Sequence, residues 1–318
     1  MKKEDLKIVF FGTPEFAVES LSKLVVNDFN IVGVVTMPDK VAGRGHKLFQ
    51  SPVKQFALEH GLNLMQPTNL KDPEFVQQLQ ALNADLFIVI AFRMLPEVVW
   101  TMPPLGTFNL HASLLPKYRG AAPINWAIIN GETETGVTTF FLKHEIDTGD
   151  IISRQSIKIL PDDNAGTVHD KLMHLGAALT LDTVNDIING NLTLTPQDLL
   201  AEYVAPTPAP KIFKETCRIN WNLPAEYVHN FVRGLSPYPA AWTELVTPEE
   251  NLQLKIFTTA IGHICHLTPG TIVVEGNHMY IACADRLLEI ISLQLAGKRR
   301  MNTPEFLRGF NPEPYTTA

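Results

Sequence analysis

Residues 7–12 read KIVFFG, a short apolar run that decides the fold class. Two runs of the same kind follow, IVGVVT at 31–36 and LFIVIAF at 86–92. Continuous runs rich in Val, Ile and Phe are typical of strands buried on both faces of a parallel sheet. Between these runs apolar side chains recur at helical spacing, at Val18, Leu21, Leu24 and Val25 and at Phe75, Leu79 and Leu82. The alternation predicts an open, mostly parallel, Rossmann-like α/β sheet.

The length of 318 residues is about twice that of a usual single domain, which favours two domains. A helix is predicted over 165–190, with Val168, Leu172, Leu175 and Leu179 at helical spacing. The proline-containing stretch that follows suits a semi-rigid connector. We therefore expect a catalytic domain at 1–190, a linker at 191–210 and a second domain at 211–318.

The second domain is expected to be a small OB-like β-barrel. Short β-like runs occur at 218–221, 241–245, 252–258, 271–274, 279–283 and 287–293. The residues at 275–278 read as a hairpin turn, and one helix is predicted at 225–235. Barrels of this type commonly bind nucleic acids.

The composition favours a cytoplasmic protein that has no contact with membranes. No apolar run approaches the ~20 residues of a membrane span, and the N-terminal MKKEDLKIVFFG carries acids in place of a signal-peptide core. The net charge of −7 argues against non-specific binding of nucleic acid, but residues 210–318 hold ten Lys or Arg and ten Asp or Glu. Contacts with nucleic acid would therefore come from local basic patches.

Neither a disulfide framework nor a metal site is expected. The three cysteines are widely spaced and form no C-x-x-C pair. The cluster at 262–266, GHICH, does not have the ligand spacing of a zinc motif.

Two segments follow predicted strands in the first domain, at the edge where open α/β sheets bind ligands. The turn GTPEF at 12–16 has one glycine and does not match G-x-G-x-x-G, so it is either a plain strand-to-helix turn or part of a non-nucleotide pocket. The longer segment PDKVAGRGHKLFQSPVK at 38–54 contains Lys40, Arg44, Lys47 and Lys54. It is interpreted as a basic loop for a phosphate-bearing partner, with an ordinary solvated loop as the alternative.

The stretch FNLHASLLPKYRGAAP at 108–123 contains the main candidate for chemistry. Residues two apart in a strand point to the same side, so Asn109 and His111 should share a face. An amide donor beside an imidazole suits acyl transfer, because both can stabilise a developing oxyanion. Leu114, Leu115 and Pro116 could form an apolar wall for a flat ligand. A purely structural histidine is the competing interpretation.

Asp147, in IDTGDI at 146–151, follows a predicted strand at 136–142. It is expected at the same end of the neighbouring strand as His111, where it would orient the ring or favour its protonated form. No serine or cysteine is accompanied by a base of its own. Direct transfer to an amine is therefore favoured over a covalent intermediate.

Several motifs together resemble the methionyl-tRNA formyltransferases, within the folate-dependent formyltransferase family. They are FFGTPEFA, the AGRG loop, NLHASLLPKYRGAAPI, DTGD, INW, VRGLSPYPAAW and QLAGKRRM, and they cover nearly the whole chain. The resemblance implies that 10-formyltetrahydrofolate donates the formyl group, leaving tetrahydrofolate. It implies that the acceptor is the α-amino group of initiator methionyl-tRNA in translation initiation, with no metal and no stable protein partner.

The resemblance also implies roles for particular residues. Asn109, His111 and Asp147 would be catalytic. The folate site would be formed by Ser113, Leu114, Leu115 and Pro116 together with Phe92, Met94 and Leu95. The tRNA contacts would come from Lys40, Arg44 and Lys47 in the loop and from Lys211, Lys214, Lys298, Arg299 and Arg300 in the second domain, where a solvated run of charges is the alternative.

Two other functions remain open on the sequence. A formyltransferase for an amino sugar or another small amine would not need the long basic loop or the barrel. An inactive tRNA-binding protein would not need Asn109, His111 and Asp147. One departure from the family pattern, KHEI at 143–146, leaves the geometry of the loop before Asp147 open.

Overall fold

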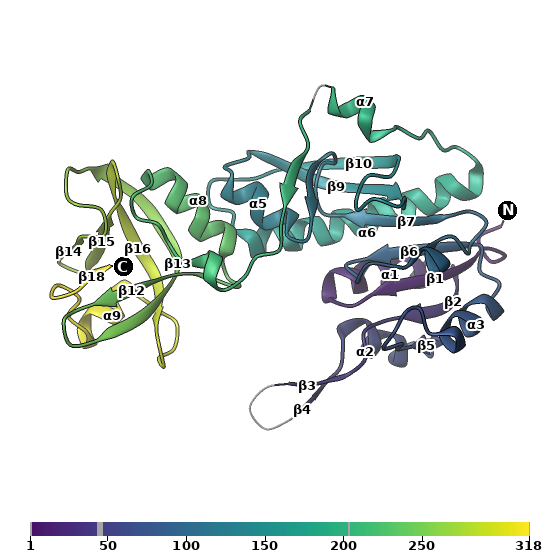
Figure 1. Ribbon diagram of the computed structural model, residues 1–318, viewed down its shortest axis with the longest axis horizontal. Coiled ribbons are helices and arrows are strands. Elements are labelled where there is room, and N and C mark those ends of the chain that lie inside the picture. The colour runs from purple at the N-terminus through teal and green to yellow at the C-terminus, as the bar shows by residue number, and fades with distance from the viewer. Residues whose placement is uncertain (1, 43–46, 203, 318) are drawn as a thin grey trace. The chain divides into compact units, whose positions relative to one another are not determined.

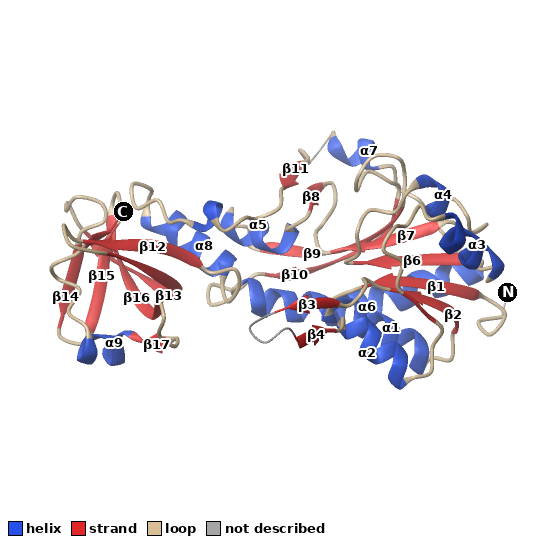
Figure 2. Ribbon diagram, turned by 60° about the horizontal axis from the view of Figure 1, so that its bottom comes forward, coloured by secondary structure: helices blue, strands red, loops and turns tan. Residues whose placement is uncertain are grey.

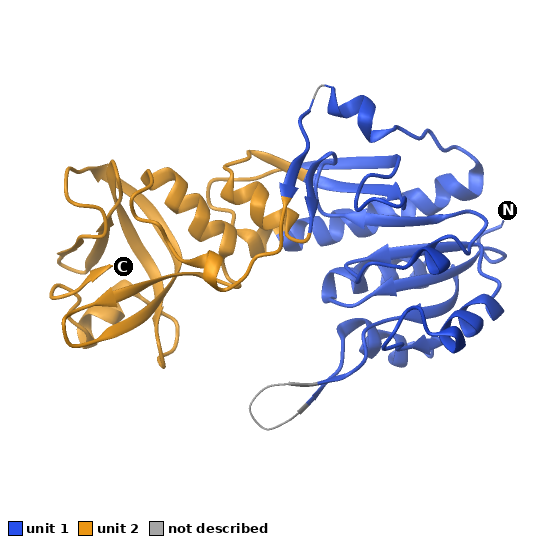
Figure 3. Cartoon of the chain, in the orientation of Figure 1, with its two compact units in different colours: residues 1–120, 136–157, 169–208 blue, residues 121–135, 158–168, 209–318 orange. Residues whose placement is uncertain are grey.

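The computed structural model describes residues 2–42, 47–202 and 204–317. The chain divides into two compact units (Figure 3). The first contains residues 1–120, 136–157 and 169–208, and the second contains residues 121–135, 158–168 and 209–318. Two segments that lie within the predicted catalytic domain therefore group with the second unit.

The first unit is built on a seven-stranded sheet with the order β10-β9-β7-β6-β1-β2-β5 (Figure 1). The strands are β1 (Lys7–Gly12), β2 (Asn30–Val35), β5 (Leu64–Met65), β6 (Leu86–Ile90), β7 (Thr107–His111), β9 (Glu134–Phe141) and β10 (Ile151–Lys158). The neighbours from β5 to β7 pair in parallel, whereas β9 runs antiparallel to β7. The predicted Rossmann-like, mostly parallel sheet is confirmed.

Helices cover both faces of this sheet, with α1, α2 and α6 on one face and α3 and α4 on the other (Figure 2). Their bounds are α1 (Glu15–Val26), α2 (Pro52–Glu59), α3 (Pro73–Ala81), α4 (Glu97–Trp100) and α6 (Ala165–Asn189). Side-chain caps fix two of the starts, because Ser51 accepts from Lys54 N at 3.1 Å and Asp72 accepts from Glu74 N at 3.0 Å. The helix predicted over 165–190 is confirmed by α6. Of the helices in the described residues, α6 included, none is long and apolar enough to cross a membrane.

The segment predicted as one long loop at 38–54 contains regular structure. Two short strands, β3 (Lys40–Ala42) and β4 (Lys47–Phe49), pair antiparallel, and α2 begins at Pro52. The sequence did not reveal this hairpin, because strands of three residues give no measurable hydrophobic period.

The predicted connector also has secondary structure. It contains α7 (Gln197–Ala201) and β11 (Thr207–Ala209). Thr195 forms a bridge with Ile151, and β11 pairs with β8 (Lys117–Gly120), as Figure 2 shows. The part of this segment up to residue 208 therefore packs onto the first unit.

The second unit contains a curled antiparallel sheet of the OB-like type, in the order β14-β15-β16-β13-β12-β18 with β17 beside β16. Its strands are β12 (Ala241–Val246), β13 (Asn251–Ile264), β14 (Ile272–Glu275), β15 (His278–Ala282), β16 (Arg286–Leu295), β17 (Met301–Asn302) and β18 (Thr316–Thr317). Its helical elements are α5 (Pro123–Ile129), η1 (Glu215–Cys217), α8 (Ala225–Leu235) and α9 (Thr303–Gly309). The helix predicted at 225–235 and the turn predicted at 275–278 are confirmed.

The prediction of a strand at 218–221 is wrong. Only Arg218 forms a bridge there, with Trp242, and the Asn220 side chain then accepts from Asn222 N at 3.1 Å, which turns the chain. Ile219 and Trp221 are buried in the core of the second unit, and this alternation produced the β-like pattern.

Candidate active site

The strand β7 provides the two central side chains of the site. Leu110 packs toward α6, where a Cβ added to Gly176 would lie 2.7 Å from Leu110 Cδ2. Strand alternation places Asn109 and His111 on the opposite side. Asn109 is half-buried and His111 is 7% exposed. Within the described part of the chain, no hydrogen bond occupies the Asn109 amide, so it is available to a ligand.

The His111 ring is fixed by β8. Its Nε2 lies 2.8 Å from the carbonyl oxygen of Tyr118, a residue whose φ is 62°. Because a carbonyl oxygen can only accept, Nε2 carries the hydrogen of this bond. The other ring nitrogen, Nδ1, lies 3.8 Å from Asp147 Oδ2. A protonated His111 therefore has its second hydrogen at Nδ1, next to the carboxylate.

Asp147 reaches His111 by a different route from the one predicted. Its expected place at the same end of the neighbouring strand is wrong, because β9 runs antiparallel to β7 and Phe141 lies opposite Phe108. The loop after β9 turns back, with Asp147 at a φ of 55°. A Cβ on Gly149 would lie 1.5 Å from the Phe141 carbonyl oxygen, so only glycine permits this return.

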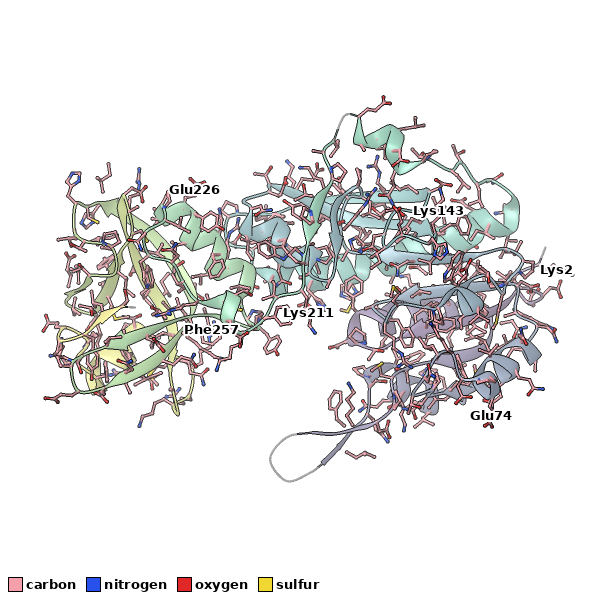
Figure 4. The ribbon with its side chains drawn as sticks, in the orientation of Figure 1. Lys2, Glu74, Lys143, Lys211, Glu226 and Phe257 are labelled. Carbon is pink, nitrogen blue, oxygen red and sulfur yellow. The ribbon has the colours of Figure 1, made fainter. Side chains whose placement is uncertain are left out.

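Further bonds close the loop that carries Asp147. Asp147 Oδ2 accepts from Gly120 N at 2.9 Å. Lys143, labelled in Figure 4, contacts Asp150 with Nζ 2.8 Å from Oδ1. Thr148 Oγ1 donates to Glu145 O at 3.0 Å. The residues that depart from the family pattern thus form a closed turn.

The predicted folate segment after β7 is more deeply buried than expected. The side chains of Ser113 and Leu115 are fully buried, and Leu115 packs against Phe140 and Ile151. Thr138 Oγ1 donates to Ser113 O at 2.6 Å and accepts from Leu115 N at 3.2 Å. Leu115 therefore belongs to the core and not to an open apolar wall, while Leu114 is half-buried and Pro116 is buried.

The second predicted folate stretch lies after β6. Phe92 is half-buried, with its ring centroid 5.8 Å from that of Phe11, and Leu95 is buried in the same apolar cluster. Met94 is 75% exposed. Of these three side chains Met94 is thus the one most accessible to a ligand.

The turn after β1 is tightly packed. A Cβ on Gly12 would lie 2.7 Å from Ala17 Cβ, and Pro14 is the residue before the first residue of α1. Among the described residues, the buried Thr13 hydroxyl lacks a hydrogen-bond partner. The packing shows a tight strand-to-helix turn, and the Thr13 hydroxyl is a polar group in it that a ligand could use.

The basic segment at 38–54 is partly described. Lys40 is exposed at the start of β3, whereas Arg44 and the Lys47 side chain lie outside the described residues. At the base of the hairpin, Lys54 Nζ lies 2.6 Å from Asp39 Oδ2. Hydrogen bonds from Lys54 and then Gln66 hold the pKa of Asp39 below its ordinary value. Lys54 thus anchors the hairpin.

The basic residues predicted in the second unit are exposed, and several have protein partners. Lys211 Nζ lies 5.4 Å from the centroid of the Phe213 ring, and both Lys214 and Lys298 are exposed. Arg299 contacts Glu305, with its side chain still 72% exposed. Arg300 stacks 4.3 Å over the ring of Phe257, labelled in Figure 4, and donates to Ser292 Oγ at 2.9 Å.

The cysteines are free, and Cys217 and Cys283 are buried. Burial, and secondarily the charge of Asp285, raises the pKa of Cys283 to about 12, so its thiol is protonated at neutral pH. Across the described ranges, no group of three or more His, Cys, Asp or Glu side chains could hold a metal ion.

Sequence reasoning missed two side chains near the trio. Arg119 follows Tyr118 in β8, and it donates from Nε and Nη2 to Gln197 Oε1 at 3.0 and 2.7 Å. Gln197, in the predicted linker, is buried and bonds to the loop of Asp147. A basic side chain at Arg119, so close to His111, could have indicated a role near the site. Nothing in the sequence near Gln197 indicated its contact with the loop of Asp147.

The geometry brings an amide, an imidazole and a carboxylate to one edge of the sheet. An amide N–H and a protonated imidazole can both stabilise an oxyanion that forms during attack on an acyl carbon. A carboxylate beside the ring can orient it and can take up a proton. The arrangement suits transfer of an acyl group without a protein nucleophile.

Family models and relatives agree with this chemistry. A model described as formyl transferase matches residues 6–184, and one described as formyl transferase, C-terminal domain, matches residues 211–311. A methionyl-tRNA formyltransferase from Bacteroides fragilis is 60% identical over 98% of this chain and 97% of its own length. One from Flavobacterium johnsoniae is 50% identical over 96% of each chain.

Solved structures share the fold at lower identity. An N-formyltransferase from Helicobacter canadensis, in complex with folinic acid and dTDP-3-aminofucose, superposes with a TM-score of 0.67 at 19% identity, covering 93% of this chain and 100% of its own. HypX from Aquifex aeolicus, in complex with tetrahydrofolic acid, gives a TM-score of 0.63 at 16% identity, covering 94% of this chain and 46% of its own.

Proposed function

The chain belongs to the methionyl-tRNA formyltransferase family and is a one-carbon transferase; we propose that its acceptor is initiator methionyl-tRNA and its donor 10-formyltetrahydrofolate. The observation that carries this proposal is the meeting of Asn109, His111 and Asp147 at one edge of the sheet. His111 is held there by the Tyr118 carbonyl at 2.8 Å and faces Asp147 at 3.8 Å. A charged tRNA is a substrate of protein synthesis, which favours a cytoplasmic reaction.

The transfer proceeds by attack of the neutral α-amino group on the formyl carbon. A carbon–nitrogen bond forms, and the carbonyl electrons move to the formyl oxygen. Asn109 donates a hydrogen bond to this oxyanion, and the positive charge of a protonated His111 stabilises it. Asp147 orients the ring and assists removal of the amine proton.

Collapse of the intermediate completes the reaction. The carbonyl re-forms, the bond between the formyl carbon and N10 of the folate breaks, and N10 receives the proton that the amine has lost. The products are the formylated amine and tetrahydrofolate, and the protein returns to its starting protonation state. We assign the folate to the edge that carries Leu114 and Met94, because Met94 is exposed and Leu114 is half-buried there, whereas Ser113, Leu115 and Pro116 are buried.

The tRNA is assigned to the basic hairpin and to the basic residues of the second unit. A phosphate backbone is bound by exposed Lys and Arg side chains, and Lys40, Lys298 and Arg299 are exposed. Arg44 and Lys47 of the segment at 38–54 are part of the same assignment. The relatives at 50–60% identity that are named for methionyl-tRNA support this acceptor over an amino sugar.

A formyl-transfer assay tests the proposal. Labelled 10-formyltetrahydrofolate is supplied with initiator methionyl-tRNA, with elongator methionyl-tRNA, or with a dTDP-linked amino sugar. We expect label on initiator methionyl-tRNA well above the label on either control. Preferential labelling of the amino sugar would replace the proposed acceptor, and no labelling of any acceptor would support an inactive tRNA-binding protein.

A further inference from the structure

Gln197 is the buried residue of α7, in the segment predicted to be a spacer. Its side chain is 1% exposed, whereas its neighbours Asp198 and Leu199 are exposed. A buried polar side chain is costly unless its hydrogen-bonding groups are satisfied. The partners of Gln197 therefore indicate why this residue type is present.

The amide of Gln197 makes four hydrogen bonds. Nε2 donates to the carbonyl oxygens of Asp147 and Gly149 at 2.9 and 2.8 Å. Oε1 accepts from Nε and Nη2 of Arg119 at 3.0 and 2.7 Å. A glutamine amide has two N–H donors and two lone pairs, so every position is used. Both donors hold the loop of Asp147, one at that residue and one two residues later.

These bonds join the two elements that position the catalytic side chains. Arg119 lies in β8 between Tyr118, whose carbonyl oxygen accepts from His111 Nε2, and Gly120, whose N–H donates to Asp147 Oδ2. Gln197 links this strand to the loop from the other side. β8, Gln197 and Asp147 thus form a closed hydrogen-bonded circuit, and His111 is bonded to it through Tyr118.

The loop needs such support. Asp147 has a φ of 55°, a conformation that persists in a folded protein when its surroundings hold it. Its carboxylate makes one described hydrogen bond, from Gly120 N, and lies 3.8 Å from His111 Nδ1. The two bonds from Gln197 fix the backbone on which this carboxylate depends.

We propose that Gln197 is a positioning residue for formyl transfer, which sets the place of Asp147 relative to His111 with Arg119 as its partner. The catalytic part of this inference rests on the proposed function. It makes the connecting segment a part of the catalytic machinery. The positioning of the loop can be measured without any turnover.

Three variants separate positioning from packing. Gln197→Ala removes all four bonds, and Gln197→Glu keeps the acceptors for Arg119 but brings no hydrogen to the two loop carbonyls. Asp198→Asn, at the exposed neighbouring position, is the matched control. Because a shift of about 1 Å in a catalytic group can lower the rate about a hundredfold, we expect kcat to fall ten- to a hundredfold in both Gln197 variants. KM should change by less than about threefold, since Gln197 is 1% exposed and offers almost no surface to a substrate.

A double-mutant cycle shows whether Gln197 acts through Asp147. In the Asp147→Asn background, adding Gln197→Ala should lower kcat by less than about twofold more, because the group that Gln197 positions is already impaired. A full, multiplicative further loss would overturn the inference, and so would a Gln197→Ala protein with a kcat within about twofold of wild type.

Hydrogen exchange tests the positioning independently of catalysis. Backbone amides in residues 142–150 and the amide of Gly120 should exchange faster in both Gln197 variants than in the wild type. Their exchange rates should be unchanged in Asp198→Asn. The amides of β1 and β6 serve as the protected reference. Unchanged exchange of the loop would overturn the inference. If the wild-type chain transferred no formyl group while the loop exchange still rose, the proposed function would fail and the positioning role would stand.

Discussion

The proposed catalytic residues Asn109, His111 and Asp147 differ from the proposed tRNA-binding residues of the second unit in burial and in bonding. His111 is 7% exposed and each ring nitrogen faces a specific group, whereas Lys298 is exposed and the Arg299 side chain is 72% exposed. Buried, directional bonds make each member of a site decisive, because a lost partner leaves a group unsatisfied. Exposed charges act together through a screened field, and each contributes little. The difference predicts how steeply each region responds to substitution.

His111→Ala should have the largest effect. It removes the ring that faces Asp147 and whose charge stabilises the oxyanion, so kcat should fall on the order of a hundredfold or more. Steady-state formyl transfer with an unchanged circular dichroism spectrum checks this. A folded His111→Ala protein that kept most of its turnover would place the chemistry elsewhere.

Gly149→Ala should come next. The added Cβ would lie 1.5 Å from the Phe141 carbonyl oxygen, so the loop must move and carry Asp147 with it. We expect kcat to fall about tenfold or more, with a smaller change in KM. Gly309→Ala is the matched control, since a Cβ there meets nothing within 4 Å. Equal activity of the two variants would show that the loop tolerates displacement.

Lys298→Ala should affect binding and not the chemical step. Removing one phosphate contact should make the plot of log affinity for tRNA against log salt less steep by roughly 0.7 to 0.9. Binding titrations at several salt concentrations measure this slope, with Lys71→Ala, an exposed lysine of the first unit, as the control. Identical slopes for the two variants would show that Lys298 is not part of the proposed tRNA site.

The smallest effect concerns the stability of the second unit. Burial, and then the charge of Arg233, lowers the pKa of His229 below its ordinary 6.5. As pH falls, His229 of the unfolded chain is therefore protonated before His229 of the folded chain, which favours unfolding. The stability associated with the neutral, buried His229 is full above pH 6.5 and is lost as pH falls below it. The melting temperature of His229→Gln should drop less than that of the wild type between about pH 7.5 and about pH 5.5. A His266→Gln control should follow the wild type, and an equal drop in all three proteins would contradict the prediction.

The sequence predicted those parts of the fold that depend on local burial. β1 and α8 have the predicted bounds. The spacing of apolar residues, together with the glycine and proline residues beside them, determines where such elements begin and end. The OB-like sheet was also predicted correctly, but the strand at 218–221 was not, since Ile219 and Trp221 alternate in a turn that enters the core. Alternation alone does not distinguish these two cases.

The site was predictable where chemistry and spacing agree. Asn109 and His111 follow from strand alternation, but the route of Asp147 required the antiparallel pairing of β9, which the sequence did not indicate. Leu115 was predicted to line a ligand site, but it belongs to the core. An apolar residue near a site can have either place, and the sequence does not distinguish the two. The role of Gln197 could not be predicted from the sequence, because its hydrogen bond to Asp147 joins residues 50 positions apart and depends on the fold of both segments.

The most direct test of the account is a single-turnover experiment with labelled 10-formyltetrahydrofolate and initiator methionyl-tRNA, run with the wild-type chain and with Asn109→Ala. We expect the wild-type chain to transfer label to the methionine, and we expect the rate to be lower by on the order of a hundredfold in Asn109→Ala, with tRNA affinity unchanged. Equal rates for the two proteins, or no transfer by the wild-type chain, would contradict it.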